Sequence, residues 1–515
     1  MVLFSVTNTV TVVKGSEKEL HHIRNRCTVI YDYFIKPRYR KTPQHKTREL
    51  CYFVDNTFPT GWLSVITVFC RRQHIAYEVE DTREKPSRIS LSLLAMEAEP
   101  WDHQVEALRS IEEENRGFIH VPTRGGKTLI MGLSIASFAV PSLVIVPNRM
   151  LLHQEYDVFC TMFGADHVGR IGDGYEEYNH DIIVATVQTL HSRIDHPEMQ
   201  VSVFNRIGYV LFDECHHIKQ GGYEPRNTYF TVADRFVNAY YRVGFTATPG
   251  ATGKLQRVLL EAVTGPMLYS ISIEKLTEQQ ILTKAKAQMV VVERPKTPTL
   301  REIMASRYNI TDSRGDLEET CRQMGIPIPH IPDFRQQLND KVINSPGFRR
   351  LIKTIAEQQA AQGKRVLVVV SRVEKGVEVF TDGGECSIAD AAGLSGKTKD
   401  REEILQRFKD GQIAILVSTV VKEGVDIPIA DVVIMAAADV MDPIPVLQRV
   451  GRVLTGHKGK EQALIIDFFI KDKGTLARHS KKRMELYIDQ GFEVEVVGAE
   501  MYKSEGDNGE DTVSS

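Results

Sequence analysis

The sequence lacks any apolar stretch that approaches the roughly 18 uninterrupted residues of a membrane-spanning helix. Its first residues, Met1 to Val13, lack the basic start and the apolar run of a signal peptide. The 7 cysteines are scattered and form no Cys-x-x-Cys pair, which excludes a zinc site of that common spacing. These absences indicate a protein with reduced thiols outside the membrane, and we expect it in the cytoplasm.

Neither polarity nor charge dominates the composition. Hydrophobic residues make up 42% and charged residues 25%, which is ordinary for a globular protein and excludes a disordered chain. The 515 residues exceed what one core usually holds, so about three domains are expected. The net charge is −3, yet residues 1–98 carry 15 Lys and Arg against 10 Asp and Glu. This basic part is a candidate nucleic-acid surface, although a mild excess is also typical of a solvated face.

The basic part, residues 1–97, mixes helical and strand patterns and is predicted to form a small α+β domain. Within it, residues 36–41 alternate cations with an aromatic ring. Arg38, Arg40 and Lys41 would contact phosphates while Tyr39 stacks on a base or sugar. We therefore expect an accessory DNA-binding domain.

After Pro100, short apolar runs alternate with helical patterns, which predicts buried parallel strands in doubly wound α/β sheets. The predicted strands are 118–121, 142–146, 181–185, 207–212 and 241–245, followed by 365–370, 413–417, 432–435 and 463–466. Two similar lobes in tandem follow, 98–283 and 284–499. A proline-rich insertion at about 294–345 and a disordered acidic tail at 500–515 complete the expected organisation.

The first lobe contains a candidate phosphate-binding loop. The strand 118–121 runs into Pro-Thr-Arg-Gly-Gly-Lys-Thr at 122–128 and then into an apolar helix. Thr123, Gly125 and Gly126 would line the loop, and backbone N–H groups at the helix N-terminus would bind phosphate. Lys127 would reach the β- and γ-phosphates, and Thr128 would ligate Mg²⁺. Taken alone, this Gly-Gly-Lys-Thr is also compatible with a chance turn.

An acidic pair strengthens that interpretation. The strand 207–212 ends at Asp213 and Glu214, at the edge of the sheet where α/β proteins bind ligands. Asp213 would hold Mg²⁺, and Glu214 would polarise the attacking water. The alternative is that the pair caps the next helix.

Residues 213–216 read Asp-Glu-Cys-His, which resembles the DECH form of the DEAD/DEAH box of superfamily 2 helicases. The other family motifs follow in order. Gln104 resembles the adenine-reading Q motif. His216, Thr246, Thr248 and Gln448 match positions that couple hydrolysis to movement. Taken singly, Gln104 is also compatible with a helix-surface residue, and the two threonines with turn hydroxyls; the order and spacing over 100–455 carry the assignment.

The resemblance implies a set of DNA contacts and a set of residues from the second lobe. The DNA contacts would come from Pro147, Asn148, Arg149, Thr186 and Gln188 in the first lobe and from Ser371, Arg372, Ser418 and Thr419 in the second. Gly424 and Asp426 would bind the nucleotide, although Asp426 is also compatible with a strand-end cap. Arg452, with Arg449 beside it, would act as the arginine finger.

Within the superfamily, the match is strongest to UvsW-type branch-migrating helicases of tailed bacteriophages, with XPB-type translocases as more distant relatives. The resemblance implies a DNA-dependent ATPase that uses ATP and Mg²⁺, acts on forked, branched or single-stranded DNA, and works in the host cytoplasm if a phage encodes it. We expect a monomer. The chain departs from the family at Arg124, where a small residue is common, and at Thr455, where a further arginine is frequent. A duplex translocase without strand separation and a nucleotide-switched binding protein remain the alternatives.

Overall fold

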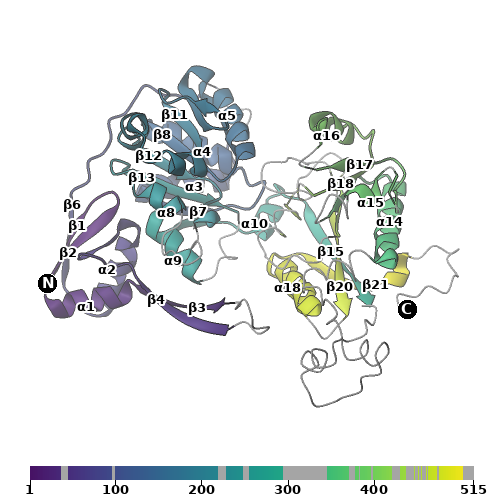
Figure 1. The fold of residues 1–515 in the computed structure, drawn as a ribbon, viewed down its shortest axis with the longest axis horizontal. Helices are drawn as coiled ribbons and strands as arrows, with labels where there is room; N and C mark the ends of the chain where they lie inside the picture. The colour runs from purple at the N-terminus through teal and green to yellow at the C-terminus, as the bar shows by residue number, and fades with distance from the viewer. Residues whose placement is uncertain are drawn as a thin grey trace, which may run out of the picture. The chain divides into compact units, whose positions relative to one another are not determined.

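The fold is taken from a computed structural model that describes most of the chain. The described residues are 1–35, 44–94, 99–218, 228–247, 254–293, 345–370, 377–381, 383–384, 386–395, 398–419, 430–436, 446, 450–451, 454, 460, 462–471 and 475–502. They form two compact units, Met1–Leu276 and Thr277–Ser515, which we describe separately (Figure 1). No helix among these residues is long and apolar enough to cross a membrane.

The N-terminal part of the first unit is built on a four-stranded sheet with the order β5-β2-β1-β6. Strand β1 buries every second side chain, the pattern of a strand with one face in a core. Its elements are β1 (Val2–Val6), β2 (Val10–Lys14), α1 (Glu17–Arg26), β5 (Thr57–Pro59), η1 (Thr60–Trp62), α2 (Leu63–Arg72) and β6 (Tyr77–Asp81). A separate antiparallel hairpin, β3 (Thr28–Ile35) and β4 (Gln44–Cys51), projects from these elements (Figure 1). This is the predicted small α+β domain.

The rest of the first unit is a lobe around an eight-stranded sheet with the order β10-β9-β11-β8-β12-β13-β7-β14. All neighbours in it pair in parallel except β9 and β10. Its strands are β7 (Arg116–His120), β8 (Ser142–Val146), β9 (Val168–Gly172), β10 (Tyr175–Glu176), β11 (Ile182–Thr186), β12 (Tyr209–Phe212), β13 (Tyr241–Thr246) and β14 (Met267–Ser270). Every residue of β8, β11 and β12 is buried, because helices cover both faces of a parallel sheet.

Helices follow the strands of this lobe in the order expected of a doubly wound sheet. They are α3 (Asp102–Glu114), α4 (Lys127–Phe138), α5 (Arg149–Phe163), α6 (Val187–Ser192), α7 (Pro197–Met199), α8 (Thr228–Ala233), α9 (Lys254–Val263) and α10 (Ile273–Glu278), with the short turns η2 (Ala165–His167), η3 (Gln200–Phe204) and η4 (Cys215–His217). Helices α3, α4 and α5 pack in series, and α6 packs against α8. Since the strands run in parallel, the loops after β7, β8, β11, β12 and β13 all leave the same edge of the sheet.

The N-terminal domain packs tightly on this lobe. One hydrophobic core runs from Phe4 and Phe58 to residues of α8 and α9. The indole N–H of Trp62 donates a 2.9 Å hydrogen bond to the Val258 carbonyl oxygen. A β-carbon on Gly61 would lie 2.1 Å from the Glu261 carbonyl oxygen, so only glycine allows this approach of η1 to α9. The two parts therefore belong to one compact unit.

The second unit contains a seven-stranded parallel sheet with the order β17-β18-β16-β19-β20-β15-β21. Its strands are β15 (Lys284–Glu293), β16 (Val366–Val369), β17 (Ala391–Leu394), β18 (Ile415–Ser418), β19 (Val432–Met435), β20 (Gln462–Lys471) and β21 (Glu493–Gly498). The helices are α14 (Pro346–Ala361), α15 (Glu378–Phe380), α16 (Arg401–Lys409) and α18 (Thr475–Asp489), with the turn η8 (Ala499–Tyr502). Two RecA-like lobes in tandem confirm the predicted fold class.

The predicted strands of both lobes are present, with ends displaced by a few residues, but several strands were not predicted. Strand β15 joins the second sheet between β20 and β21, although its sequence, Lys-Ala-Lys-Ala-Gln-Met-Val-Val-Val-Glu, begins with alternating lysines. The tail was predicted to begin at residue 500. Residues up to Tyr502 instead form η8, and the Tyr502 hydroxyl donates to the Gln288 side-chain oxygen at 2.6 Å. The predicted insertion, except its last residue, and the remainder of the tail lie outside the described residues.

A buried ion pair attaches α18 to the second sheet. Arg483 donates through Nε to Asp467 Oδ2 at 2.8 Å and through Nη2 to Oδ1 at 3.0 Å. The Tyr487 hydroxyl donates to the same carboxylate at 2.8 Å. Because the exposed fractions of the two charged side chains are only 1% and 0%, each charge depends on the other for its solvation.

Replacing Arg483 with alanine should therefore destabilise the second unit by about 3–5 kcal/mol, because the Asp467 carboxylate would remain buried without its cation. Urea unfolding followed by circular dichroism measures this loss. The matched control is Lys481→Ala on the same helix, whose pair with Glu485 is exposed and should contribute less than about 1 kcal/mol. Equal losses for the two variants would contradict the assignment.

Candidate nucleotide-binding site

The loop after β7 has the backbone of a phosphate-binding loop. Helix α4 begins at Lys127, and no side chain among the described residues caps its N-terminus. By contrast, Asn148 and Thr186 cap α5 and α6 with their side chains. The first N–H groups of α4 therefore remain available to an anion, and the helix dipole favours negative charge at that end.

Two glycines allow the loop to pack closely. Gly126 has φ +78°, and a β-carbon there would lie 2.1 Å from Gln104 Nε2. A β-carbon on Gly125 would lie 2.4 Å from the side chain of Val121, the residue that stands in place of the usual first glycine. Arg124 adopts φ +74°, a left-handed conformation that glycine tolerates better than arginine. The loop therefore adopts this backbone with Val121 and Arg124 at the two positions where the sequence departs from the family.

The side chain of Gln104 connects Trp101 to the phosphate-binding loop by hydrogen bonds. Its side-chain oxygen accepts from the Trp101 backbone N–H at 2.9 Å, and its amide nitrogen donates to the Gly125 carbonyl oxygen at 3.3 Å. The neighbouring His103 Nε2 lies 2.8 Å from the same carbonyl oxygen. The Q-motif glutamine thus lies beside the phosphate-binding loop, where the sequence places it. Its predicted contact with adenine stays a prediction.

The ammonium of Lys127 contacts the acidic pair after β12. Lys127 Nζ lies 3.1 Å from Glu214 Oε1, and the exposed fractions of these side chains are 13% and 12%. Burial alone lowers the pKa of Lys127, but the carboxylates of Glu214 and Asp213 raise it above its ordinary value. Glu214 itself has φ +45°, a strained conformation of the kind that functional sites retain. The lysine is therefore charged and close to the predicted catalytic base.

A further carboxylate, which the sequence interpretation missed, joins this group. Glu155 on α5 is buried, and Thr128 Oγ1 donates to its Oε1 at 3.0 Å. Burial, together with the charge of Asp213, raises the pKa of Glu155 to about 8. A sequence signal exists, because Glu155 shares the apolar helical stripe of Leu152 and Phe159, where a carboxylate is unexpected.

The two predicted coupling residues of the first lobe that the structure describes lie in contact. His216 Nδ1 lies 3.2 Å from Thr246 Oγ1 and 3.2 Å from Glu214 Oε2. The Thr246 carbonyl oxygen accepts from the Val121 backbone N–H at 3.1 Å, at the entrance to the phosphate-binding loop. A path of contacts therefore connects the acidic pair, the end of β13 and the loop.

The predicted DNA-contact residues of the first lobe lie after the neighbouring strands β8 and β11. The Gln188 amide nitrogen donates to the Pro147 carbonyl oxygen at 2.9 Å. Asn148 accepts from the backbone of α5, Thr186 caps α6 and is buried, and Arg149 pairs with Asp173 at 2.9 Å. In the structure these side chains contact other parts of the protein, and their predicted contacts with DNA stay predictions.

In the second unit, Ser418 is the buried last residue of β18, and the Thr419 backbone N–H donates to the Leu394 carbonyl oxygen at 3.2 Å. Thr123 lies in the turn of the phosphate-binding loop and is half-buried. The remaining predicted site residues lie outside the described residues: Arg38, Arg40, Lys41, Thr248, Ser371, Arg372, Gly424, Asp426, Gln448, Arg449 and Arg452.

The arrangement in the first lobe fits Mg²⁺ and a nucleoside triphosphate. The uncapped N-terminus of α4 and the Lys127 ammonium suit phosphate oxygens, and the Thr128 hydroxyl and Asp213 carboxylate are oxygen ligands of the kind that Mg²⁺ prefers. Among the described residues, no three His, Cys, Asp or Glu side chains are grouped to hold a metal on their own.

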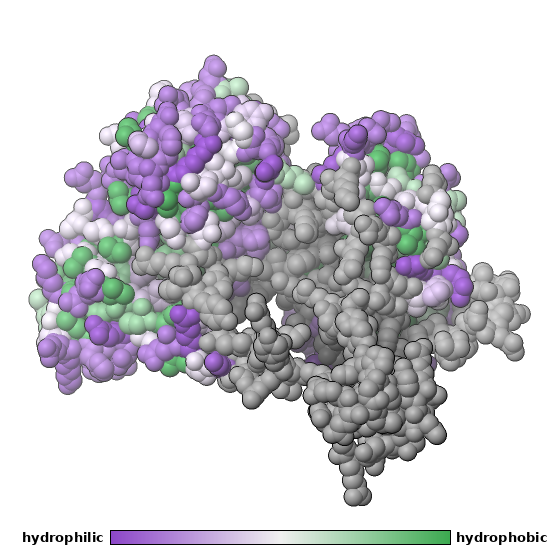
Figure 2. Space-filling view, viewed as in Figure 1, coloured by the Kyte–Doolittle hydropathy of each residue, from purple (hydrophilic) through white to green (hydrophobic). Residues whose placement is uncertain are grey.

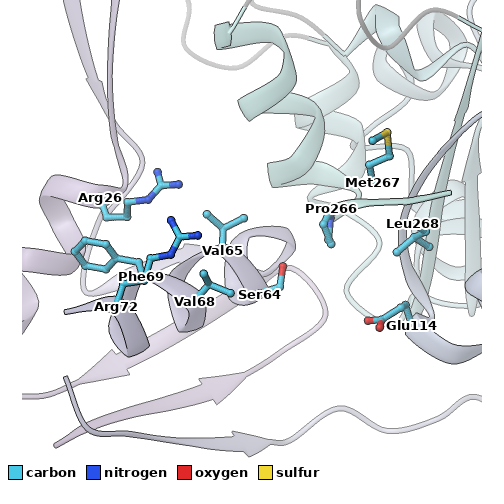
Figure 3. A pocket seen from close by; sticks show the side chains of 10 residues that line it. All are labelled: Arg26, Ser64, Val65, Val68, Phe69, Arg72, Glu114, Pro266, Met267 and Leu268. Carbon is cyan, nitrogen blue, oxygen red and sulfur yellow. The ribbon is translucent and has the colours of Figure 1, made fainter. Parts of the chain in front are cut away.

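A cavity of about 570 Å³ lies elsewhere in the first unit, between α1, α2 and the edge strand β14 (Figure 3). Val65, Val68 and Leu268 give it an apolar lining, and Arg26 and Arg72 extend alongside (Figure 3). Figure 2 shows apolar side chains at the surface of the N-terminal domain, and the exposed ones there include Ile30 and Val54. The cavity contains none of the predicted nucleotide-binding residues.

Comparisons with known proteins agree with this site. Residues 97–251 match the family model "Type III restriction enzyme, res subunit", and residues 347–455 match "Helicase conserved C-terminal domain". The DNA 3'-5' translocase XPB2 of Sulfurisphaera tokodaii is 27% identical over 81% of this chain and 91% of its own length. The ATP-dependent DNA helicase uvsW of Enterobacteria phage T4 is 22% identical over 92% of this chain and 95% of its own.

The chain belongs to helicase superfamily 2. The predicted resemblance to UvsW-type members is confirmed, since the similarity to uvsW extends over both lobes and the N-terminal domain. The solved structure of the restriction-modification enzyme LlaBIII bound to DNA shares the fold, with a TM-score of 0.54 and 15% identity over 80% of this chain and 32% of that one.

One histidine near the phosphate-binding loop makes the stability of this superfamily 2 helicase depend on pH. His120 Nε2 lies 3.1 Å from the Ala247 carbonyl oxygen, and burial lowers the pKa of His120 to about 4. The folded protein therefore favours neutral His120, while in the unfolded chain the histidine takes up a proton near pH 6.5. Its stabilising contribution is complete above that pH and is lost as the pH falls toward 4.

Between pH 7 and pH 5, His120→Gln should lose about 2 kcal/mol less unfolding free energy than the unchanged protein. Urea unfolding at the two pH values measures the difference. His191→Gln, a change at an exposed histidine of the same lobe, should leave the pH dependence as it is. A His120→Gln variant with an unaltered pH dependence would show that His120 ionises freely in the folded state.

Proposed function

We propose that the chain is an ATP-dependent DNA helicase that moves along DNA and unwinds or branch-migrates forked or junction DNA. The proposal depends mainly on the ion pair between Lys127 and Glu214, because Lys127 is the first residue of α4 and no side chain caps that helix end. Two relatives of similar length support DNA as the nucleic acid along which the protein moves, because they are named as a DNA translocase and a DNA helicase.

In the proposed cycle, the α4 N-terminus and Lys127 bind the phosphates of ATP, and Thr128 and Asp213 hold Mg²⁺. When bound there, Mg²⁺ would supply positive charge that offsets the charge of the transferring phosphoryl group. Glu214 accepts a proton from the attacking water, and Arg452 of the second lobe stabilises the transition state. His216 contacts Thr246 at the end of β13. Through this contact, hydrolysis would shift β13 and so drive movement along DNA.

DNA would be held by its phosphates at the ends of β8 and β11 and by the predicted contacts of the second lobe. Because phosphates are the same at every base, such a grip allows movement independent of sequence. The N-terminal domain, with its cluster Arg38, Arg40 and Lys41, would supply an additional grip.

Hydrolysis and strand separation test the proposal together. ATPase activity should rise on single-stranded, forked or four-way DNA, and labelled strands should be displaced from forks and junctions. ATP-driven movement on duplex DNA without strand displacement would favour a duplex translocase. Negligible turnover with ATP-dependent DNA binding would contradict the helicase and favour a nucleotide-switched binding protein. Stronger stimulation by RNA would contradict the DNA preference.

The acidic pair yields a sharper prediction. Glu214→Gln should lower turnover by on the order of 10²–10³, because the base is lost while Thr128 and Asp213 still hold Mg²⁺. ATP should then remain bound, and DNA affinity in ATP should rise. Filter binding of labelled ATP and anisotropy of labelled DNA measure both quantities.

The companion variant is Lys127→Ala, which should lose hydrolysis by the same order because the ammonium no longer neutralises the phosphates, yet keep DNA binding in the absence of ATP. Near-normal turnover by Glu214→Gln would contradict its assignment as base. Loss of DNA binding by Lys127→Ala would instead indicate damage to the fold.

A further inference from the structure

The carboxylate of Glu155 belongs to none of the motifs that define the proposed site. The buried side of helix α5 includes Leu152, Phe159 and Met162, and Glu155 lies on the same side with 2% of its surface exposed. Burying a carboxylate is costly unless a partner compensates. Its position in the core therefore indicates either a compensating interaction with another side chain or a function.

The side chain of Glu155 forms a hydrogen bond with the helix that follows the phosphate-binding loop. Thr128 Oγ1 donates to Glu155 Oε1 at 3.0 Å. The second oxygen, Oε2, is buried and has no hydrogen-bond partner among the described residues. Glu155 therefore has unused accepting capacity beside the residue predicted to ligate Mg²⁺.

A purely structural role does not account for the choice of a carboxyl group. The side chain of glutamine would accept the same hydrogen bond from Thr128 without the cost of burying an ionisable group. Glu155 also interacts electrostatically with Asp213, Glu214 and Lys127. Asp213 and Glu214 carry two negative charges against the one positive charge of Lys127, and this excess suits a divalent cation.

We propose that Glu155 is a positioning residue of the Mg²⁺ site. A hydroxyl has one proton and two lone pairs. By accepting a hydrogen bond from Thr128, Glu155 turns the lone pairs of the Thr128 hydroxyl away from itself and toward the metal. Carboxylates that orient metal ligands in this way commonly raise metal affinity about 10- to 100-fold. The inference rests on the proposed nucleotide site.

The test measures Mg²⁺ requirement rather than turnover. Binding of a fluorescent methylanthraniloyl-ADP is followed while Mg²⁺ is titrated, and binding in EDTA is recorded separately. Glu155→Leu should raise the half-saturating Mg²⁺ concentration about 10-fold or more, and the nearly isosteric Glu155→Gln should raise it less, since it keeps the hydrogen bond. Binding in EDTA should be unchanged for both. The control is Asp157→Asn, which removes an exposed carboxylate from the same helix.

A double-mutant cycle makes the mechanism specific. If Glu155 acts through Thr128, adding Glu155→Leu to Thr128→Ala should change the Mg²⁺ requirement by much less than the two single effects combined. Full additivity would overturn the positioning role, as would a Glu155→Leu variant with unchanged Mg²⁺ requirement. If thermal melting shows that Glu155→Leu does not fold, an unchanged requirement for Glu155→Met, which also removes the acceptor, overturns the inference.

Failure of the proposed function gives a different result. An unchanged protein that binds no adenine nucleotide at any Mg²⁺ concentration would contradict the nucleotide site itself, and the role of Glu155 with it. An unchanged protein that binds nucleotide normally, with variants of the same Mg²⁺ requirement, would contradict the role of Glu155 alone.

Discussion

The contact between Lys127 and Glu214 is the interaction on which the rest of the site depends. It joins the loop after β7 to the loop after β12, which lie on either side of β13 in the sheet. Parallel pairing brings these loops to one edge, and β13 ends between them with Thr246 in contact with His216. We expect a change at the phosphates to reach β13 through these contacts, as a motor that converts hydrolysis into movement requires.

Much of this could be predicted from the sequence because the signals are local. Apolar runs such as Ser142–Val146 identify buried strands, and Gly125, Gly126 and Lys127 identify the loop that follows one. Parallel topology then places Asp213 and Glu214 near that loop without any knowledge of distances. Strand β15 was missed because its first half alternates lysines with alanines, and only pairing with β20 and β21 shows that it belongs to the sheet.

What the sequence did not reveal are contacts between segments that are distant along the chain. The role of Gly61 depends on the backbone of α9, some two hundred residues away, and Trp62 donates to the same helix. These contacts hold the N-terminal domain against the first lobe. Glu155 could have been suspected from its place in an apolar stripe, but its contact with Thr128 required the fold.

In the proposed cycle, Lys127 exchanges its contact with Glu214 for a contact with phosphate when nucleotide binds. A crystal structure with Mg²⁺, ADP and beryllium fluoride tests this directly. The account predicts Lys127 Nζ within hydrogen-bond distance of the phosphate and fluoride groups, Thr128 and Asp213 at the metal, and Glu214 released from the lysine. A nucleotide bound elsewhere, with Lys127 still 3.1 Å from Glu214, would contradict it.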